Sequence, residues 1–203
     1  MNDTIRIGIV GYGNLGRGVE AALRRAPDMR LAGIYTRREP SLLRRPAGEA
    51  PAYGMEALDG HGDGIDVLIL CGGSKSDLPE QGPALAARFN TVDSYDTHAR
   101  IPAYFAAMDA AARSGGHTAL ISVGWDPGLF SLHRLLGEAF LPEGDSYTFW
   151  GKGISQGHSD AVRRVSGVQA AVQYTLPSPS ALARVRAGER PRLTTREKHA
   201  REC

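Results

Sequence analysis

Three glycines near the start of the chain have the spacing of a turn that binds phosphate. Gly11, Gly13 and Gly16 form a G-x-G-x-x-G pattern between a short apolar run, 5–10, and an amphipathic helical pattern that begins near Leu15. In such a unit the first glycine permits a tight turn, the second lets backbone approach a pyrophosphate, and the third lets helix and strand pack closely. The helix N-terminus adds N–H groups and a partial positive charge. The pattern predicts dinucleotide binding, and a glycine-rich turn in another α/β protein is the alternative.

A pair of arginines follows the next apolar segment, 29–36. An NAD-binding protein usually carries Asp or Glu at this point, where the carboxylate accepts a hydrogen bond from the ribose 2′-hydroxyl. This chain has Thr36, Arg37 and Arg38 instead, and guanidinium groups offer paired donors to phosphate oxygens. We therefore expect NADP. Glu39 is compatible with NAD, and two arginines that merely face solvent would need no ligand.

Alternating strand and helix patterns position these residues. We expect strands over 5–10, 29–36, 65–71, 91–92 and 117–123, and helices from about 15 and over 77–89 and 101–114. Between them, 40–64 is expected to be a variable loop with room for one short helix or strand. Such alternation predicts an α/β fold with a doubly wound parallel sheet of the Rossmann type. Ligands of such sheets bind at the carboxyl ends of the strands. The predicted cofactor-binding residues are Gly11, Gly13, Asn14, Leu15, Gly16, Thr36, Arg37, Arg38, Cys71, Gly72, Ser74, Asp93, Ser94 and Tyr95.

The regular alternation stops after residue 123. We expect a turn over 124–128, a helix over 129–140, strands over 146–150 and 168–176 with a loop over 151–157 between them, a short helix within 177–188, and a capping box at 194–197. Ser159 and Asp160 have the types of a helix N-cap. A catalytic triad from His158, Ser159 and Asp160 is disfavoured, because a triad needs groups adjacent in space rather than consecutive in sequence. We therefore expect a nucleotide-binding domain over 1–121 and part of an α+β substrate or dimerisation domain over 122–203.

Composition is that of an ordinary soluble globular protein. Of 203 residues, 42% are hydrophobic and 23% charged, and a net charge of +2 gives no indication of nucleic-acid binding. The apolar run 65–71 is too short to span a bilayer, and no signal-peptide pattern precedes the first strand. Cys71 and Cys203 have neither disulfide nor zinc spacing. We expect a cytoplasmic protein that binds no metal, membrane or nucleic acid, with Cys71 as inert packing.

Several longer blocks of the sequence resemble the diaminopimelate dehydrogenase family. They are G-I-V-G-Y-G-N-L-G-R-G (8–18), the arginine pair, V-D-S-Y-D-T-H (92–98), S-V-G-W-D-P-G (122–128), F-W-G-K-G-I-S-Q-G-H-S-D-A-V-R-R (149–164) and G-V-Q-A-A-V-Q-Y-T-L-P-S (167–178). The resemblance implies NADP-dependent, reversible oxidative deamination of meso-2,6-diaminopimelate at its D-centre, which gives L-2-amino-6-oxopimelate and ammonia in lysine biosynthesis. It also implies a homodimer.

The family's motifs also imply a set of substrate-binding residues. They are Asp96, Trp125, Asp126, Trp150, Gln156, Gly157, Thr175 and Arg201. The two aspartates would contact the amino groups of the substrate and are the catalytic candidates. The tryptophans would exclude water, Gln156 and Gly157 would bind polar ends, and Thr175 with Arg201 would bind a carboxylate. The duller alternatives are a turn-forming Asp before Pro-Gly and tryptophans of an ordinary core. The sequence leaves open which group moves the protons.

The chain departs from the family at its end. The family continues past the position of Cys203, and a histidine and an asparagine that contact substrate there have no counterparts. We therefore expect an intact nucleotide half and an incomplete substrate half. Two other interpretations stay open. One is a related NADP oxidoreductase such as a dihydrodipicolinate reductase or an aspartate-semialdehyde-type enzyme. The W-D-P-G block argues against this interpretation. The other is a nucleotide-binding module without catalytic activity.

Overall fold

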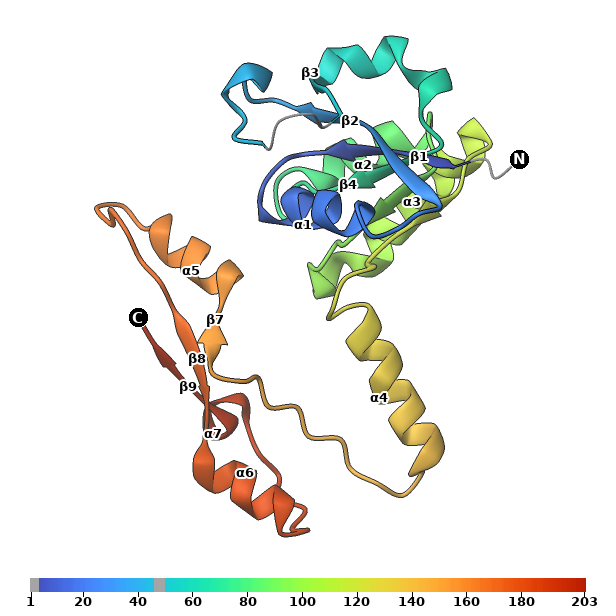
Figure 1. Cartoon of the computed structure of the whole chain (residues 1–203). Helices are drawn as coiled ribbons and strands as arrows, with labels where there is room; N and C mark the ends of the chain where they lie inside the picture. The colour runs from blue at the N-terminus through green and yellow to red at the C-terminus, as the bar shows by residue number, and fades with distance from the viewer. Residues whose placement is uncertain (1–3, 46–49) are drawn as a thin grey trace. The chain divides into compact units, whose positions relative to one another are not determined.

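The structure is a computed structural model, and it describes residues 4–45 and 50–203 (Figure 1). The chain divides into two compact units, Met1–His133 and Arg134–Cys203, and we describe each by itself. The division falls inside helix α4 (Leu129–Phe140). The domain boundary that we expect between residues 121 and 122 is a different division of the chain, and it stays a prediction.

The first unit contains a parallel sheet. Among its described residues the strands are β1 (Ile5–Val10), β2 (Met29–Thr36), β3 (Ala52–Gly54), β4 (Val67–Leu70), β5 (Thr91–Asp93) and β6 (Ala119–Leu120). Their order is β3-β2-β1-β4-β5-β6, and every neighbouring pair is parallel. The chain starts in the middle of the sheet, runs to one edge, and then returns to build the other half from β4. This confirms the doubly wound fold, with its crevice where the direction reverses, between β1 and β4.

Helices cover both faces of this sheet (Figure 1). Helix α1 (Asn14–Leu23) contributes to the hydrophobic cluster that contains Ile7, Ile9 and Ile34. Helices α2 (Leu78–Ala86) and α3 (Ile101–Gly115) contribute to the other cluster, with Leu68 and Leu70. Successive strand residues face opposite sides, so a strand buried on both faces must be apolar throughout. Short 3₁₀ helices lie in the connections: η1 (Pro40–Leu42), η2 (Met55–Gly60), η3 (Gly62–Gly64) and η4 (His98–Arg100).

The last strand of the sheet is shorter than expected. The predicted strand over 117–123 was too long, because β6 pairs with β5 only at Ala119 and Leu120. Beyond them Ser122 has a positive φ of 59°, and its N–H donates to the carboxylate of Asp93 at 3.0 Å. The N–H of Val123 donates to the main-chain oxygen of Asp93 at 2.8 Å. The chain therefore turns across the end of β5 instead of extending beside it.

The second unit has an antiparallel sheet. Within 134–203 it consists of β7 (Gly153–Ile154), β8 (Tyr174–Pro177) and β9 (His199–Glu202), in the order β7-β8-β9. Its helices, after the end of α4, are α5 (Gln156–Arg163), α6 (Pro179–Arg186) and α7 (Thr195–Lys198). The capping box is confirmed, because the Thr194 hydroxyl accepts the N–H of Glu197 while the Glu197 carboxylate accepts the N–H of Thr194.

Three expectations about this unit were wrong. Residues 146–150 form no strand, and β7 forms instead within the stretch expected to be a loop. The strand expected over 168–176 is reduced to β8, whose partner β9 offers four residues for pairing. Ser159 is not an N-cap, because α5 begins at Gln156. Its hydroxyl instead donates to the carbonyl of Ser155 at 2.6 Å and accepts the N–H of Gln173 at 2.8 Å, which ties α5 to the approach of β8.

Candidate functional site

The glycine turn between β1 and α1 has one open side. Gly11 has a φ of 89°, which favours glycine, and its N–H donates to the carbonyl of Tyr35 at 2.8 Å. A Cβ on Gly16 would lie 2.3 Å from the Gly11 oxygen, so this contact requires glycine. A Cβ on Gly13 would meet nothing within 4 Å. The first and third glycines are therefore needed by the protein itself, whereas the second borders the space that a phosphate group would enter.

The N-terminus of α1 suits an anion. Gly13 is its N-cap, and among the described residues of its first turn none is acidic and none caps it through a side chain. Asn14 and Leu15 follow as exposed helical residues. The helix dipole and the N–H groups of the first turn therefore meet the side of the turn that Gly13 leaves open. These residues fit the pyrophosphate of a dinucleotide.

The two arginines directly follow β2, and one of them contacts this turn. Thr36, the buried last residue of β2, accepts the N–H of Arg38 through its hydroxyl at 3.1 Å. The guanidinium of Arg38 donates to the carbonyl of Tyr12 inside the glycine turn. The guanidinium of Arg37 donates to Asp77 at 2.9 Å and keeps 66% of its side chain exposed. Two cationic groups thus stand at the carboxyl end of β2, where a ribose phosphate would be recognised.

The loop after β4 is fixed to β1 and to the start of α2. The N–H of Cys71 donates to the carbonyl of Val10 at 2.7 Å, and Asp77 accepts the N–H of Gly73 at 2.9 Å. A Cβ on Gly72 would lie 2.8 Å from the Cβ of Asp77, so this loop packs tightly on the start of α2. Burial raises the pKa of the Cys71 thiol to about 12. A thiol that stays protonated is unreactive, which agrees with a packing role.

The end of β5 is held by a buried carboxylate. One oxygen of Asp93 accepts the N–H of Tyr95 at 2.9 Å and that of Ser122 at 3.0 Å, and the other accepts the Tyr104 hydroxyl at 2.7 Å. The rings of Tyr95 and Tyr104 stack with their centroids 4.0 Å apart. Burial and the Asp93 carboxylate raise the pKa of Tyr104, so the hydroxyl remains a donor. Asp93 and Tyr95 are therefore buried residues that support the carboxyl end of β5. Their contact with the cofactor stays a prediction.

The two candidate aspartates follow adjacent strands. Asp96 is exposed after β5, and its N–H donates to the hydroxyl of Ser74 at 3.1 Å, which links the loops after β4 and β5. Asp126 lies in the turn after β6, where its carboxylate accepts the Ser131 hydroxyl at 3.4 Å. Ser94 lies against this same turn, 3.4 Å from where a Cβ on Gly124 would stand. The fold thus brings Asp96 and Asp126 to one edge of one sheet.

Trp125 is only half buried. It exposes 54% of its surface, stacks on Phe130 with a centroid distance of 5.5 Å, and meets the edge of His133 at 6.2 Å. It is therefore not a core residue, and its exposed face is available to a ligand at the edge that carries Asp126.

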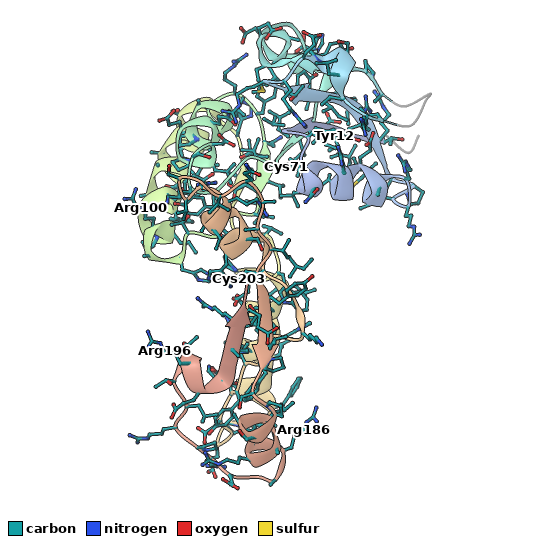
Figure 2. The ribbon with its side chains drawn as sticks, turned by 90° about the vertical axis from the view of Figure 1, so that its left-hand side faces the viewer. Tyr12, Cys71, Arg100, Arg186, Arg196 and Cys203 are labelled. Carbon is teal, nitrogen blue, oxygen red and sulfur yellow. The ribbon has the colours of Figure 1, made fainter. Side chains whose placement is uncertain are left out.

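In the second unit the two predicted carboxylate-binding residues are direct neighbours. Thr175 of β8 is paired with Arg201 of β9 across the antiparallel sheet. Arg201 also lines a cavity of about 400 Å³ together with Thr195, Arg196 and His199. Arg196 of α7 and Cys203, which directly follows β9, are labelled in Figure 2. A hydroxyl beside a guanidinium, at the wall of a cationic cavity, suits a carboxylate.

The remaining candidates of this unit lie around the same sheet. The main-chain N–H of Trp150 donates to Nε2 of His199 at 2.8 Å, and the Trp150 side chain is 40% exposed. Gln156 and Gly157 open α5, and the side chain of Gln156 lies outside the described part of the structure. The contact roles predicted for these residues stay predictions.

Sequence reasoning missed His199. This residue is buried, and burial together with the charges of Lys198 and Arg201 lowers its pKa, so it is a neutral acceptor for the Trp150 N–H. No local pattern marks it, because its partner lies 49 residues away in the sequence. The available signal was the alternation of side chains along β9, which directs His199 and Arg201 to the same face of the sheet.

The described residues offer neither a metal site nor a membrane-spanning helix. They contain no group of three or more His, Cys, Asp or Glu side chains arranged to hold a metal ion. Over the same residues, none of the helices combines the length and the apolar character that crossing a membrane requires.

Comparison with known proteins gives a consistent result. Residues 124–203 match the family model described as the diaminopimelic acid dehydrogenase C-terminal domain. The chain is 63% identical over 199 residues to the meso-diaminopimelate D-dehydrogenase of Ureibacillus thermosphaericus, an alignment that covers 98% of this chain and 61% of that protein. The chain thus spans about three-fifths of the length of this relative.

Solved structures agree with the sequences. The DAP dehydrogenase of C. glutamicum in complex with DAP superimposes with a TM-score of 0.88 at 49% identity, over 99% of this chain and 61% of that one. An engineered D-amino acid dehydrogenase bound to NADP⁺ gives a TM-score of 0.85 at 47% identity, over 98% of this chain and 60% of that one. The resemblance inferred from the sequence blocks is confirmed: over nearly its whole length the chain is similar to diaminopimelate dehydrogenases.

Proposed function

We propose that this chain supplies the nucleotide-binding part and a portion of the substrate region of an NADP-dependent dehydrogenase. The reaction is the reversible oxidative deamination of meso-2,6-diaminopimelate at its D-centre, which gives L-2-amino-6-oxopimelate and ammonia. The observation that carries the proposal is the pairing of an open glycine turn with Arg37 and Arg38 at the end of β2, in a chain related throughout to meso-diaminopimelate D-dehydrogenases. The cytoplasmic location expected from the sequence stays a prediction.

NADP is the cofactor of the proposed dehydrogenase. When bound, it supplies a hydride acceptor in deamination and a hydride donor in the reverse direction. The turn at Gly13 and the N-terminus of α1 would hold the pyrophosphate. Arg37 and Arg38 would bind the 2′-phosphate, with the buried hydroxyl of Thr36 fixing the backbone between them.

The substrate carries two ammonium and two carboxylate groups, and the chain offers partners for both kinds. Asp96 and Asp126 would hold an ammonium group at the edge of the parallel sheet and so orient the carbon that exchanges hydride. Thr175 and Arg201, paired across β8 and β9, would bind a carboxylate. Trp125 and Trp150, both partly exposed, would exclude water from the reacting groups.

We further propose that the protein is a homodimer. Helix α4 presents an apolar stripe at helical spacing, and every member of it is more than half exposed. The apolar stripe consists of Leu129, Leu132, Leu135, Leu136 and Phe140. A contiguous exposed apolar surface on a helix is typical of a surface that another protein surface covers.

Reduction of NADP⁺ tests the proposed activity. Purified protein is supplied with meso-diaminopimelate, D-lysine and L,L-diaminopimelate in parallel, and the absorbance of NADPH is followed. We expect reduction with the meso isomer alone and at least about tenfold less with Asp126→Asn, since one charge-assisted contact is lost. Binding of NADPH without turnover of any of the three compounds would instead favour a nucleotide-binding module.

A further inference from the structure

A buried acidic residue of α1 has two partners from outside the helix. Glu20 is 4% exposed, and one of its carboxylate oxygens accepts a hydrogen bond from the Arg45 guanidinium at 2.8 Å. Its other oxygen accepts a hydrogen bond from the hydroxyl of Tyr12. The Arg45 side chain is itself only 11% exposed, and Tyr12 is 4% exposed. We call Tyr12, Glu20 and Arg45 the acidic-helix cluster.

Stability alone is a weak explanation for such a cluster. Taking a carboxylate and a guanidinium out of water costs free energy that their attraction only roughly repays, so a buried ion pair often stabilises no better than apolar residues would. The cluster does fix geometry, because a buried charge tolerates few alternative positions once it is paired.

The cluster connects the two parts of the proposed NADP site. Tyr12 is the residue between the first two glycines of the turn, and it is labelled in Figure 2 in the part of the chain that contains β1 and α1. Its hydroxyl is bound to Glu20, while its main-chain carbonyl accepts the Arg38 guanidinium. Arg45 comes from the same segment as Arg38, after β2. The segment 38–45 is thus attached at both ends to Tyr12 and α1.

Aromatic contacts reinforce this attachment. The guanidinium of Arg45 lies 5.6 Å from the centroid of the Tyr12 ring, and that of Arg17 lies 5.8 Å from it. Cations at such distances from an aromatic ring are attracted to it. The Tyr12 side chain is therefore held both at its hydroxyl and at its ring.

We propose that Tyr12, Glu20 and Arg45 act as positioning residues for the cofactor's 2′-phosphate. By attaching the 38–45 segment to the glycine turn, they hold Arg38 where it meets this phosphate, and so set the preference for NADP over NAD. The inference rests on the proposed function, because it assumes that Arg37 and Arg38 bind the 2′-phosphate. Burial and the neighbouring Glu20 also raise the pKa of Tyr12, so its hydroxyl stays a neutral donor.

The test compares two small probes that differ only in the relevant group. Adenosine 2′,5′-bisphosphate carries the 2′-phosphate and 5′-AMP lacks it, and binding of each is measured by calorimetry. For Arg45→Met we expect affinity for the bisphosphate to fall about tenfold, the size of one charge-assisted hydrogen bond, while affinity for 5′-AMP changes less than about twofold. Arg44→Met is the matched control, because Arg44 is exposed and adjacent, and it should leave both affinities unchanged.

The conservative variants separate positioning from folding. Arg45→Lys should recover part of the lost preference, since it restores a cation beside Glu20. Tyr12→Phe keeps the ring and removes only the hydroxyl, so it should lower the bisphosphate affinity in the same selective way even if Arg45→Met fails to fold. Equal losses for both probes, or an unchanged ratio in folded Arg45→Met and Tyr12→Phe, would overturn the positioning role. Wild-type protein that does not prefer the bisphosphate would instead overturn the proposed NADP site itself.

Discussion

At the scale of single residues, we propose that the charges of Arg37 and Arg38 decide which nucleotide the chain accepts. Arg37 is paired with Asp77 yet mostly exposed, and Arg38 reaches the carbonyl of Tyr12. Both pairings leave donors of each guanidinium available, because this group has five N–H donors. A phosphate at the end of β2 would meet two cations, whereas a bare ribose hydroxyl would gain little from them.

Replacing one of these arginines should therefore change selectivity. In Arg38→Ala we expect NADP⁺ to bind about 10–100 times more weakly, because a charge-assisted phosphate contact is lost, while NAD⁺ binding changes little. Titration of intrinsic fluorescence with each nucleotide measures both affinities, with Arg44→Ala as the control. A parallel loss for NAD⁺ would mean that Arg38 supports the fold rather than the 2′-phosphate.

The histidine that accepts the Trp150 N–H makes stability depend on pH. The pKa of His199 is lowered in the folded chain, so the unfolded chain binds the proton more readily. Its contribution is present above the ordinary histidine value of about 6.5 and is lost as pH falls through the lower folded value. Between pH 7 and pH 5 the wild type should lose more stability than His199→Gln does, as thermal unfolding would measure. Parallel curves for the two proteins would contradict this role.

At the scale of elements, the unit of β1, glycine turn and α1 separates folding requirements from binding requirements. Gly16 is needed by the protein, because a side chain there would strike the Gly11 carbonyl. Gly13 borders open space, and Gly18 is exposed inside α1 with nothing near a Cβ. The three positions therefore form a matched set.

Alanine at each of these three positions should have a different combined effect on stability and on NADP⁺ affinity. Gly16→Ala should lower both stability and NADP⁺ affinity, whereas Gly13→Ala should change stability by less than about 1 kcal/mol and weaken NADP⁺ binding about tenfold or more. Gly18→Ala should stabilise the chain by about 0.5–1 kcal/mol, because alanine favours a helix interior, and should leave binding unchanged. Thermal unfolding and nucleotide titration read out each variant. Normal NADP⁺ binding by Gly13→Ala would exclude close approach of the phosphate at this glycine.

Local patterns were enough to predict the elements that depend on local sequence. The bounds of β2 and α4 agree with their apolar periodicity, and the glycine turn and arginine pair were found from spacing alone. The lengths of β6 and β8 were wrong because strand length depends on the partner strand. The pairing of Thr175 with Arg201 and the contacts of Glu20 depend on register and packing between distant segments, which no local pattern encodes.

At the scale of the whole molecule, the exposed apolar stripe of α4 is the feature that calls for a partner surface. Its members are between 51% and 77% exposed, although each is a large apolar side chain. The proposed homodimer would bury this stripe. Burying a leucine fully contributes about 1.5–3 kcal/mol, and a two-fold axis would count each contact twice.

A charge on the stripe should therefore disrupt assembly. We expect Leu136→Glu to weaken self-association at least about tenfold by sedimentation equilibrium, because the carboxylate would have to lose its water. Glu138→Gln, a change on the same helix outside the stripe, should leave the association constant unaltered. A monomeric wild type, or a dimer indifferent to Leu136→Glu, would argue against this surface as the interface.

The binding of reduced nicotinamide nucleotides tests the proposed NADP site most directly. Nucleotide fluorescence is followed while the wild-type chain is titrated with NADPH and, separately, with NADH at the same ionic strength. The open glycine turn and the two arginines at the end of β2 predict that NADPH binds at least about tenfold more tightly, and that added salt narrows the difference. Equal affinity for the two nucleotides, or tighter binding of NADH, would contradict the assignment of Arg37 and Arg38 to the 2′-phosphate.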